Sequence, residues 1–455
     1  MKTVSCWRCT LLAAALVTAA ALFFNAALAA SVLFVTTSPV QPGKFRLLAE
    51  IAEPHGITVE SRFVEKLPSE IDAHLFEGHD MVFFDTPRDH IQAFVHGRIG
   101  GALSGLRAPQ LWLHTQRPQW QGLPDDLARR LHAYYVNGSR ANFEPFFATL
   151  AAHFEGRGMQ DIPEPLVFPK SAVWHPDAPR RIFADPAAFL AWKKVSPGDH
   201  PPLIAIAIHQ QYVAAEQTDF VVDLIRRIEA AGALAMPVYM PVMEPMTPML
   251  SVDGKTIADV VINTQIMLNP EGRRSEFEAL GIPVIQAMPY RRGDAADWLA
   301  DPQGVALMDV PFYLAQAEYA GVFDIQIAAA TRKSDDQVTP IATQSAAVVA
   351  KALNLARLQR KANVDKRVAI LFYNYPPGEK NLSASFLNVP KSLMTVLDAL
   401  RAAGYDTTSM PEEELIARLQ RLLRPFYRAG ELQGLLADGL ADRLPLETYT
   451  DWLAT

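Results

Sequence analysis

Pro202-Leu-Ile-Ala-Ile-Ala-Ile208 is a short, uninterrupted apolar run, and a polar segment, His209-Gln-Gln-Tyr212, follows it directly. Such a run predicts a strand that is buried on both faces of a sheet. Downstream, residues 219–230 predict an amphipathic helix, because their apolar side chains recur with a period of about 3.6 residues. Gly232 ends this helix, and Ala233–Tyr239 predicts a second strand. Strand, helix and strand in this order indicate an α/β fold with a parallel sheet.

The same pattern occurs in two other parts of the chain. The first copy has strands at Ser31–Val35 and Ile57–Phe63 around a helix at Lys44–Glu53, and the last has a strand at Arg367–Phe372 before a helix at Val389–Ala402. Further predicted strands are Met81–Phe84, Leu111–His114, Val260–Asn263 and Val284–Gln286. The predicted fold class is therefore α/β, with successive doubly wound parallel-sheet modules of Rossmann or flavodoxin-like type, the last one incomplete.

Breaks in composition predict the domain boundaries. Residues 196–202 are rich in proline, and residues 331–340 are polar. We expect a first module over 30–199, a second over 200–362, and the start of a third, truncated module over 363–455. Within the third module, Asn388 is a predicted helix N-cap and Gly404 a predicted helix stop, and Ser409-Met-Pro-Glu412 fits a capping box.

The first 29 residues have the features of a cleavable signal peptide. Lys2 and Arg8 precede an apolar run, and Ala27-Leu-Ala29 fits the small-x-small rule for cleavage near Ala29. We therefore expect an exported, periplasmic protein, with an N-terminal membrane anchor as the alternative. Cys6 and Cys9 are the only two cysteines of the chain, so the cleaved protein would have no disulfide and no thiolate metal site.

The composition excludes several classes of protein. With 50% hydrophobic and 20% charged residues among 455, the chain is globular rather than disordered. Its net charge of −7 argues against a nucleic-acid partner. Asp253-Gly-Lys-Thr256 resembles the end of a phosphate-binding loop, but Met249 stands where that motif needs glycine. Direct ATP binding is therefore not expected, and the spacing of the histidines at 74, 79, 90 and 96 fits no standard metal site.

The most informative segment is the loop Tyr373–Pro390, which follows a predicted parallel strand. Ligands bind at that end of open α/β sheets. Tyr373 and Tyr375 offer flat faces, Asn374 and Asn381 offer hydrogen-bond donors, and Pro377 with Gly378 gives a rigid turn that permits close approach. The alternative is that this segment is only an elaborate connection between a strand and a helix.

Two other predicted strands end in polar residues. His209 follows the second-module strand and could face a ligand or its metal, or could be a structural histidine with its hydrogen bonds satisfied. Asn263-Thr-Gln265 ends another strand in the same way. These positions are the remaining candidates for a binding site.

Residues 371–378, Leu-Phe-Tyr-Asn-Tyr-Pro-Pro-Gly, and 381–393, Asn-Leu-Ser-Ala-Ser-Phe-Leu-Asn-Val-Pro-Lys-Ser-Leu, resemble the signature of a known family. This is the family of the cobaltochelatase large subunit (CobN) and the magnesium chelatase H subunit. The resemblance extends from Leu203 to the end of the chain and includes Leu280-Gly-Ile-Pro-Val-Ile285. It implies an N-terminal portion of such a large subunit.

The resemblance also implies a function. Members of the family bind a tetrapyrrole, which is either a corrin precursor or a porphyrin such as haem. They also bind a divalent metal, which is Co²⁺, Fe or Mg. AAA+ ATPase and von Willebrand-type partner subunits hydrolyse the ATP that drives insertion, here cobalt insertion in cobalamin-type biosynthesis. Whether this chain is itself an enzyme, a metal–nitrogen ligase, stays open, because the family's catalytic residues lie mainly in a later part.

Export conflicts with ATP-dependent insertion, because the periplasm holds no ATP pool. The alternatives are therefore an exported tetrapyrrole-handling protein, which removes iron from haem or serves haem or corrinoid uptake with an outer-membrane receptor, and a non-catalytic tetrapyrrole-binding fragment. Under each alternative, the expected ligand-facing residues are those of the 373–390 loop together with His209.

Overall fold

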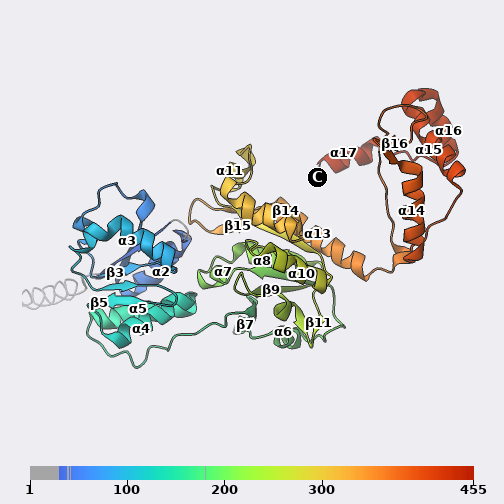
Figure 1. The fold of residues 1–455 in the computed structure, drawn as a ribbon. Helices are drawn as coiled ribbons and strands as arrows, with labels where there is room; N and C mark the ends of the chain where they lie inside the picture. Colours follow the sequence, from blue (N-terminus) through green and yellow to red (C-terminus); the bar gives the residue numbers. More distant parts are fainter. Residues whose placement is uncertain (1–29, 38–39, 41, 180, 373, 455) are drawn as a thin grey trace, which may run out of the picture. The chain divides into compact units, whose positions relative to one another are not determined.

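The computed structural model describes residues 30–454 except 38, 39, 41, 180 and 373 (Figure 1). The predicted signal peptide and Tyr373 therefore lie outside the described residues. The chain divides into two compact units, Met1–Ala356 and Arg357–Thr455. The first unit contains two sheets, each with helices on both faces, and the second unit is mostly helical.

The first sheet has the strand order β2-β1-β3-β4-β5. Its strands are β1 (Ala30–Thr36), β2 (Ile57–Phe63), β3 (Met81–Phe84), β4 (Gln110–Trp112) and β5 (Gln119–Gln121), and only β5 runs antiparallel to its neighbour. Alternate residues of β1 face opposite ways, so that Val32 and Phe34 enter one apolar cluster and Leu33 and Val35 another.

Helices cover both faces of this sheet. The Phe34 side packs against α2 (Pro42–Ala52), α4 (Asp125–Asn137) and α5 (Arg140–Phe154), and the Leu33 side packs against α3 (Asp89–Leu103). The doubly wound arrangement predicted from the sequence is confirmed for this sheet.

The second sheet has the order β15-β14-β13-β12-β8-β9-β6-β7. Its parallel strands are β8 (Leu203–Ile208), β9 (Leu234–Tyr239), β12 (Val260–Asn263), β13 (Val284–Tyr290) and β14 (Phe323–Thr331). Antiparallel strands extend both edges: β15 (Val338–Pro340), β6 (Ala172–Trp174) and β7 (Ile182–Phe183). One face packs on α8 (Asp219–Ala230) and α13 (Ala342–Arg360), and the other on α6 (Pro186–Lys193) and α10 (Pro270–Leu280).

The second sheet begins earlier in the chain than the predicted module boundary at residue 200. The strand β6 pairs with β9, with Ala172 opposite Tyr239, so residues 172–193 belong to the second sheet. Strands of three and two residues carry too little apolar pattern to be assigned from sequence.

Both sheets place a topological switch point between their first and third parallel strands. Numbered along the chain, the parallel strands of each sheet are ordered 2-1-3-4, and the second sheet adds a fifth. The chain leaves the first and third parallel strands toward opposite faces of the sheet, which opens a crevice between their carboxyl ends. In the first sheet these strands are β1 and β3, and in the second sheet they are β8 and β12.

The second unit contains α14 (Val389–Ala402), α15 (Glu412–Tyr427), α16 (Leu432–Ala437) and α17 (Leu446–Ala454), with a small hairpin of β16 (Ser383–Ala384) and β17 (Leu387–Asn388). The predicted strand at Arg367–Phe372 is wrong: this segment is not assigned as a strand, and Leu371 is 95% exposed. A strand needs a neighbour for its backbone hydrogen bonds, and no described segment pairs with this one.

The remaining elements are short. They are η1 (Glu53–His55), η2 (Val64–Lys66), η3 (Ala73–Phe76), α7 (Gln210–Ala214), α9 (Thr247–Leu250), β10 (Ser251–Val252), β11 (Lys255–Thr256), α11 (Ala295–Ala300), η4 (Leu307–Asp309), η5 (Val310–Ala315), α12 (Gln316–Tyr319), η6 (Asn363–Asp365) and η7 (Ala429–Glu431). Among the helices that the structure describes, none combines the length and the apolar character needed to cross a membrane.

Candidate functional site

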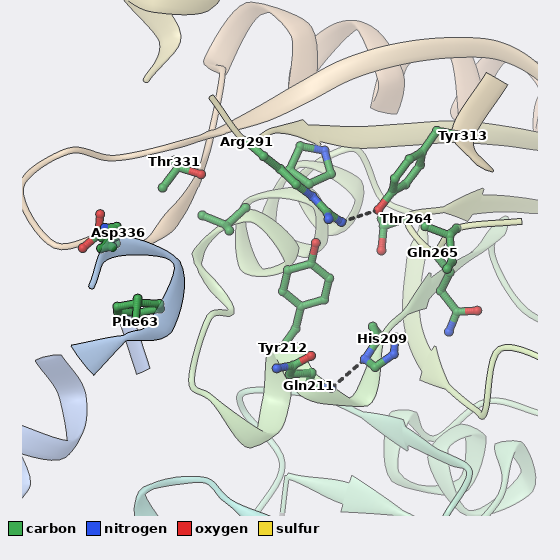
Figure 2. Close-up of a pocket in the computed structure, with 14 residues that line it drawn as sticks. Phe63, His209, Gln211, Tyr212, Thr264, Gln265, Arg291, Tyr313, Thr331 and Asp336 are labelled. Atoms are coloured by element: carbon green, nitrogen blue, oxygen red, sulfur yellow. Dashed lines mark hydrogen bonds between the residues drawn. The ribbon is translucent and has the colours of Figure 1, made fainter. Parts of the chain in front are cut away.

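A cavity of about 480 Å³ opens at the carboxyl ends of the second sheet's parallel strands (Figure 2). It lies at the β8/β12 switch point, and its volume falls within the range of about 300–1,000 Å³ that is usual for small-molecule sites. The residues that follow β8, β12, β13 and β14 supply most of the wall. The lining residues are Phe63, Lys66, His209, Gln211, Tyr212, Thr264, Gln265, Ile266, Pro289, Arg291, Tyr313, Thr331, Asp336 and Val338.

His209 lines this cavity. Its Nδ1 accepts the backbone N–H of Gln211 at 3.2 Å, which caps α7. Burial lowers the pKa of His209, and the nearby Arg88 and Arg291 lower it further, so the ring is neutral at pH 7. A neutral ring that accepts at Nδ1 carries its proton on Nε2. In this tautomer the ring has no free lone pair for a metal ion.

Arg291 follows β13 and is held by an aromatic residue of η5. Its Nη2 donates to the Tyr313 hydroxyl at 2.7 Å, and its guanidinium lies 5.6 Å from the centre of the same ring. Figure 2 shows the Tyr212 hydroxyl pointing toward this guanidinium. Burial opposes the charge, but Tyr313, Tyr212 and the Asp309 carboxylate favour it, and the pKa of Arg291 is raised. The cavity therefore holds a permanent positive charge.

Buried amides fix the cavity wall beside His209. Asn263 donates to Gln286 Oε1 at 2.7 Å, and Gln286 donates to the Gln265 carbonyl at 3.0 Å. The Gln265 side chain donates to the Ile208 carbonyl at 2.7 Å, whereas its Oε1 is buried without a partner among the described residues. This network ties the ends of β8, β12 and β13 together and leaves one acceptor unused.

A second cavity of about 240 Å³ lies at the switch point of the first sheet, and His209 and Gln211 line both cavities. Asp85 follows β3 and forms a buried ion pair with Lys44 at 3.1 Å. The Tyr135 hydroxyl donates to the same carboxylate at 2.7 Å. Asp85 thus has a cation and a phenol as partners, and Arg88 lines the same cavity.

The predicted loop residues belong to the second unit, whereas His209 belongs to the first. Asn374 donates to the Gly378 carbonyl at 3.0 Å and to the Tyr427 hydroxyl at 3.1 Å, and Asn381 donates to the Pro376 carbonyl. Both amides that were expected to bind a ligand thus stabilise the loop itself. Pro377 precedes a turn that begins at Gly378, whose carbonyl accepts the Asn381 N–H at 3.0 Å, and Tyr375 is half exposed.

One cluster of possible metal ligands occurs among the described residues: His175, Asp177 and Glu229. Arg226 binds the Asp177 carboxylate through two nitrogens at 2.5 and 2.6 Å, and Lys193 binds Glu229 at 2.5 Å. His175 uses both ring nitrogens, accepting from Asp177 N–H and contacting Glu229. These cations neutralise the carboxylates, so the donor set fits an ion-pair network better than a metal site.

Comparison with known proteins identifies the family. Residues 132–455 match the family described as CobN/Magnesium Chelatase, and the chain belongs to this family. The resemblance inferred from the 371–393 signature is thereby confirmed.

The chain is similar to several curated proteins. It is 23% identical to the magnesium-chelatase H subunit of Rhodobacter capsulatus, over 70% of this chain and 29% of that protein. It is 26% identical to the aerobic cobaltochelatase CobN subunit of Pseudomonas aeruginosa, over 65% of this chain and 24% of that protein. The chain thus spans less than a third of the length of these relatives.

The fold also matches a solved structure. The catalytic subunit of cobaltochelatase from Mycobacterium tuberculosis superposes with a TM-score of 0.64 and 21% identity, over 93% of this chain and 34% of that one. At this identity the match supports the fold.

Sequence reasoning found His209 but missed Arg291 and Tyr313. The predicted strand Val284–Gln286 ends four residues too early, and only the full length of β13, Val284–Tyr290, places Arg291 at the carboxyl end where ligands bind. Tyr313 lies in η5, a π-helical segment, and neither its position nor its pairing with Arg291 has a signal in the sequence.

Proposed function

We propose that this chain is the tetrapyrrole-binding part of a metal chelatase large subunit, and that the macrocycle binds in the His209–Arg291 cavity. One observation carries the proposal: the larger switch-point cavity combines aromatic walls with a permanent positive charge. Aromatic rings suit a flat macrocycle, and a guanidinium suits its acidic side arms. Family membership supplies the class of ligand.

The same proposal includes the metal that is inserted and the partner subunits. We expect Co²⁺ insertion into a corrin precursor as the first candidate, with AAA+ and von Willebrand-type subunits supplying ATP hydrolysis. Export through residues 1–29, with haem iron removal or uptake as the activity, is the second candidate and rests on the sequence of that segment. Cell fractionation with the mass of the isolated chain tests export, because a chain that keeps residues 1–29 in the cytoplasm contradicts it.

Visible-spectrum titration with protoporphyrin IX and with a corrin tests the binding proposal. We expect a saturable change of the absorption band with at least one macrocycle. Thr331 is half-buried and lines the cavity, whereas Thr339 is half-buried nearby and does not. Thr331→Trp fills the cavity and should weaken binding about 10-fold or more, whereas Thr339→Trp should leave it unchanged.

The 373–390 loop is the alternative location for the macrocycle-binding site. Tyr375→Ala should not change the affinity if the macrocycle binds in the cavity. Loss of binding in Tyr375→Ala together with normal binding in Thr331→Trp would move the site to the loop. Absence of binding by the unaltered protein would contradict the proposal as a whole.

A further inference from the structure

We propose that Arg291 and the Nε2–H of His209 bind a carboxylate side arm of the ligand, so that His209 recognises the macrocycle's periphery and does not ligate its metal. This inference rests on the proposed function and adds to it the group by which the macrocycle is held and oriented.

The charge of Arg291 has no direct ion pair among the described residues, although the Asp309 carboxylate acts on it electrostatically and raises its pKa. Within the described residues, no carboxylate lies within 4.0 Å of its guanidinium, and its hydrogen-bond partner is the neutral Tyr313 hydroxyl. Asp336, the acidic residue among those lining the cavity, is paired with Arg46 at 3.0 Å. A guanidinium in a protein cavity is stabilised by an anion, and it binds carboxylates through two parallel hydrogen bonds.

The acceptor role of Nδ1 determines which ring nitrogen of His209 can donate. The bond from Gln211 N–H fixes the acceptor at Nδ1, which leaves a proton on Nε2. Binding a metal through Nε2 would require the other neutral tautomer, and that tautomer would break the cap of α7. Donation to a carboxylate keeps both hydrogen bonds. His209 and Arg291 line the same cavity (Figure 2), so one carboxylate bound there can meet both.

Two buried tyrosines hold the Arg291 guanidinium in place. Tyr313 is 3% exposed, and it accepts the Arg291 hydrogen bond. Tyr212 is also buried, and its hydroxyl points to the same guanidinium (Figure 2). Tyr313 is therefore a positioning residue for Arg291. Lys66, at the cavity wall, adds a second positive charge on the side of the first sheet.

The test compares protoporphyrin IX with its dimethyl ester, which has the same ring and no carboxylate. The unaltered protein should bind the acid about 10-fold or more tightly than the ester. In Arg291→Gln this ratio should fall to about one, mainly through weaker binding of the acid. In Tyr313→Phe it should fall partway, because the guanidinium is present but less well oriented.

The matched control is Arg292→Gln. Arg292 is the next residue, does not line the cavity, and is paired with Asp301. The substitution removes one positive charge from the same strand end. An unchanged ratio of acid to ester affinity in this variant would show that the effect of Arg291→Gln depends on the place of Arg291 in the cavity and not on the net charge. An equal fall of the ratio in Arg291→Gln and Arg292→Gln would overturn the proposal.

A haem titration tests the role of His209. His209→Ala should weaken binding while leaving the position of the Soret band of the bound haem unchanged. A band shift in His209→Ala would show metal ligation and contradict the proposal. Equal affinity for acid and ester in the unaltered protein would overturn the carboxylate inference alone, whereas failure of both to bind would also overturn the proposed function.

Discussion

At the scale of single residues, three histidines share one electrostatic property. Burial lowers the pKa of His132, His175 and His209 below the value of 6.5 for a free histidine. When the pH falls below about 6.5, the unfolded chain takes up protons that these folded sites resist. The free energy of unfolding should therefore fall as the pH drops below this value, until each folded site is itself protonated.

The substitution His209→Asn tests this pH dependence. Asparagine keeps an acceptor for the α7 cap but does not titrate, so the variant should lose less stability than the parent between pH 7.5 and 5.5. Each histidine contributes at most about 1.4 kcal/mol per pH unit within its window. Urea denaturation followed by circular dichroism measures the difference.

His74 provides the control for that experiment. It is exposed, and its hydrogen bond to Glu77 raises its pKa. A raised pKa stabilises the folded state below about pH 6.5, which is the opposite sign. His74→Asn should therefore not reduce the loss of stability in acid. If His209→Asn behaves like His74→Asn, His209 is not buried and neutral as described.

At the scale of elements, two predicted helix starts had different outcomes. The prediction for Asn388 is confirmed, because its side chain accepts the Lys391 N–H at 3.1 Å at the start of α14. The capping box at Ser409 is wrong: α15 starts at Glu412 with Pro411 as its N-cap, and the Ser409 hydroxyl contacts Asp398 instead. A capping motif needs the following backbone to be helical at once, and here proline intervenes.

Alanine substitutions at these two positions should therefore differ. Asn388→Ala should destabilise the second unit by about 1 kcal/mol, because the first turn of α14 loses its acceptor. Ser409→Ala should change the free energy of unfolding by less than about 0.5 kcal/mol. Urea unfolding of both full-length variants measures this, and equal effects would show that Asn388 contributes no cap.

Several elements could be predicted from the sequence because the required information is local. The helix Asp219–Ala230 and the strand Val260–Asn263 begin and end at the predicted residues. Arg367–Phe372 has an equally apolar pattern, yet it is not a strand in this structure. Apolar periodicity predicts that a segment prefers burial, but pairing depends on which other strand lies beside it, and that information is not local.

The candidate site shows the same limit. Asn263, Gln265 and His209 can be recognised in the sequence as polar residues at strand ends. Their roles depend on hydrogen bonds that cross from β8 to β12 and β13, such as the bond from Gln265 to the Ile208 carbonyl. The tautomer of His209 likewise follows from the α7 backbone and could not be inferred from its residue type.

At the scale of the whole molecule, the two units differ in how much apolar surface they bury. The first unit contains five clusters of buried hydrophobic residues. In the described part of residues 357–455, the buried hydrophobic side chains of the core are Val389, Leu415 and Leu435. Because burial supplies most of the stabilising free energy, the second unit should open more often than the first.

Hydrogen exchange measured by mass spectrometry compares the units directly. Helices α8 and α14 have 12 and 14 residues, so their lengths are similar. Backbone amides of α14 should exchange about 10-fold or more rapidly than those of α8. Equal protection of the two helices would mean that the second unit is as stably packed as the first.

The same experiment with a bound macrocycle connects stability to function. A ligand that binds only the folded state slows the opening of the elements that it contacts. If the macrocycle occupies the His209–Arg291 cavity, protection should rise at α7 and at the residues after β13, and not at the 374–388 loop or α14. If protection from exchange rises only in that loop, the macrocycle binds to the signature residues instead. The internal hydrogen bonds of Asn374 and Asn381 would then stabilise the binding surface.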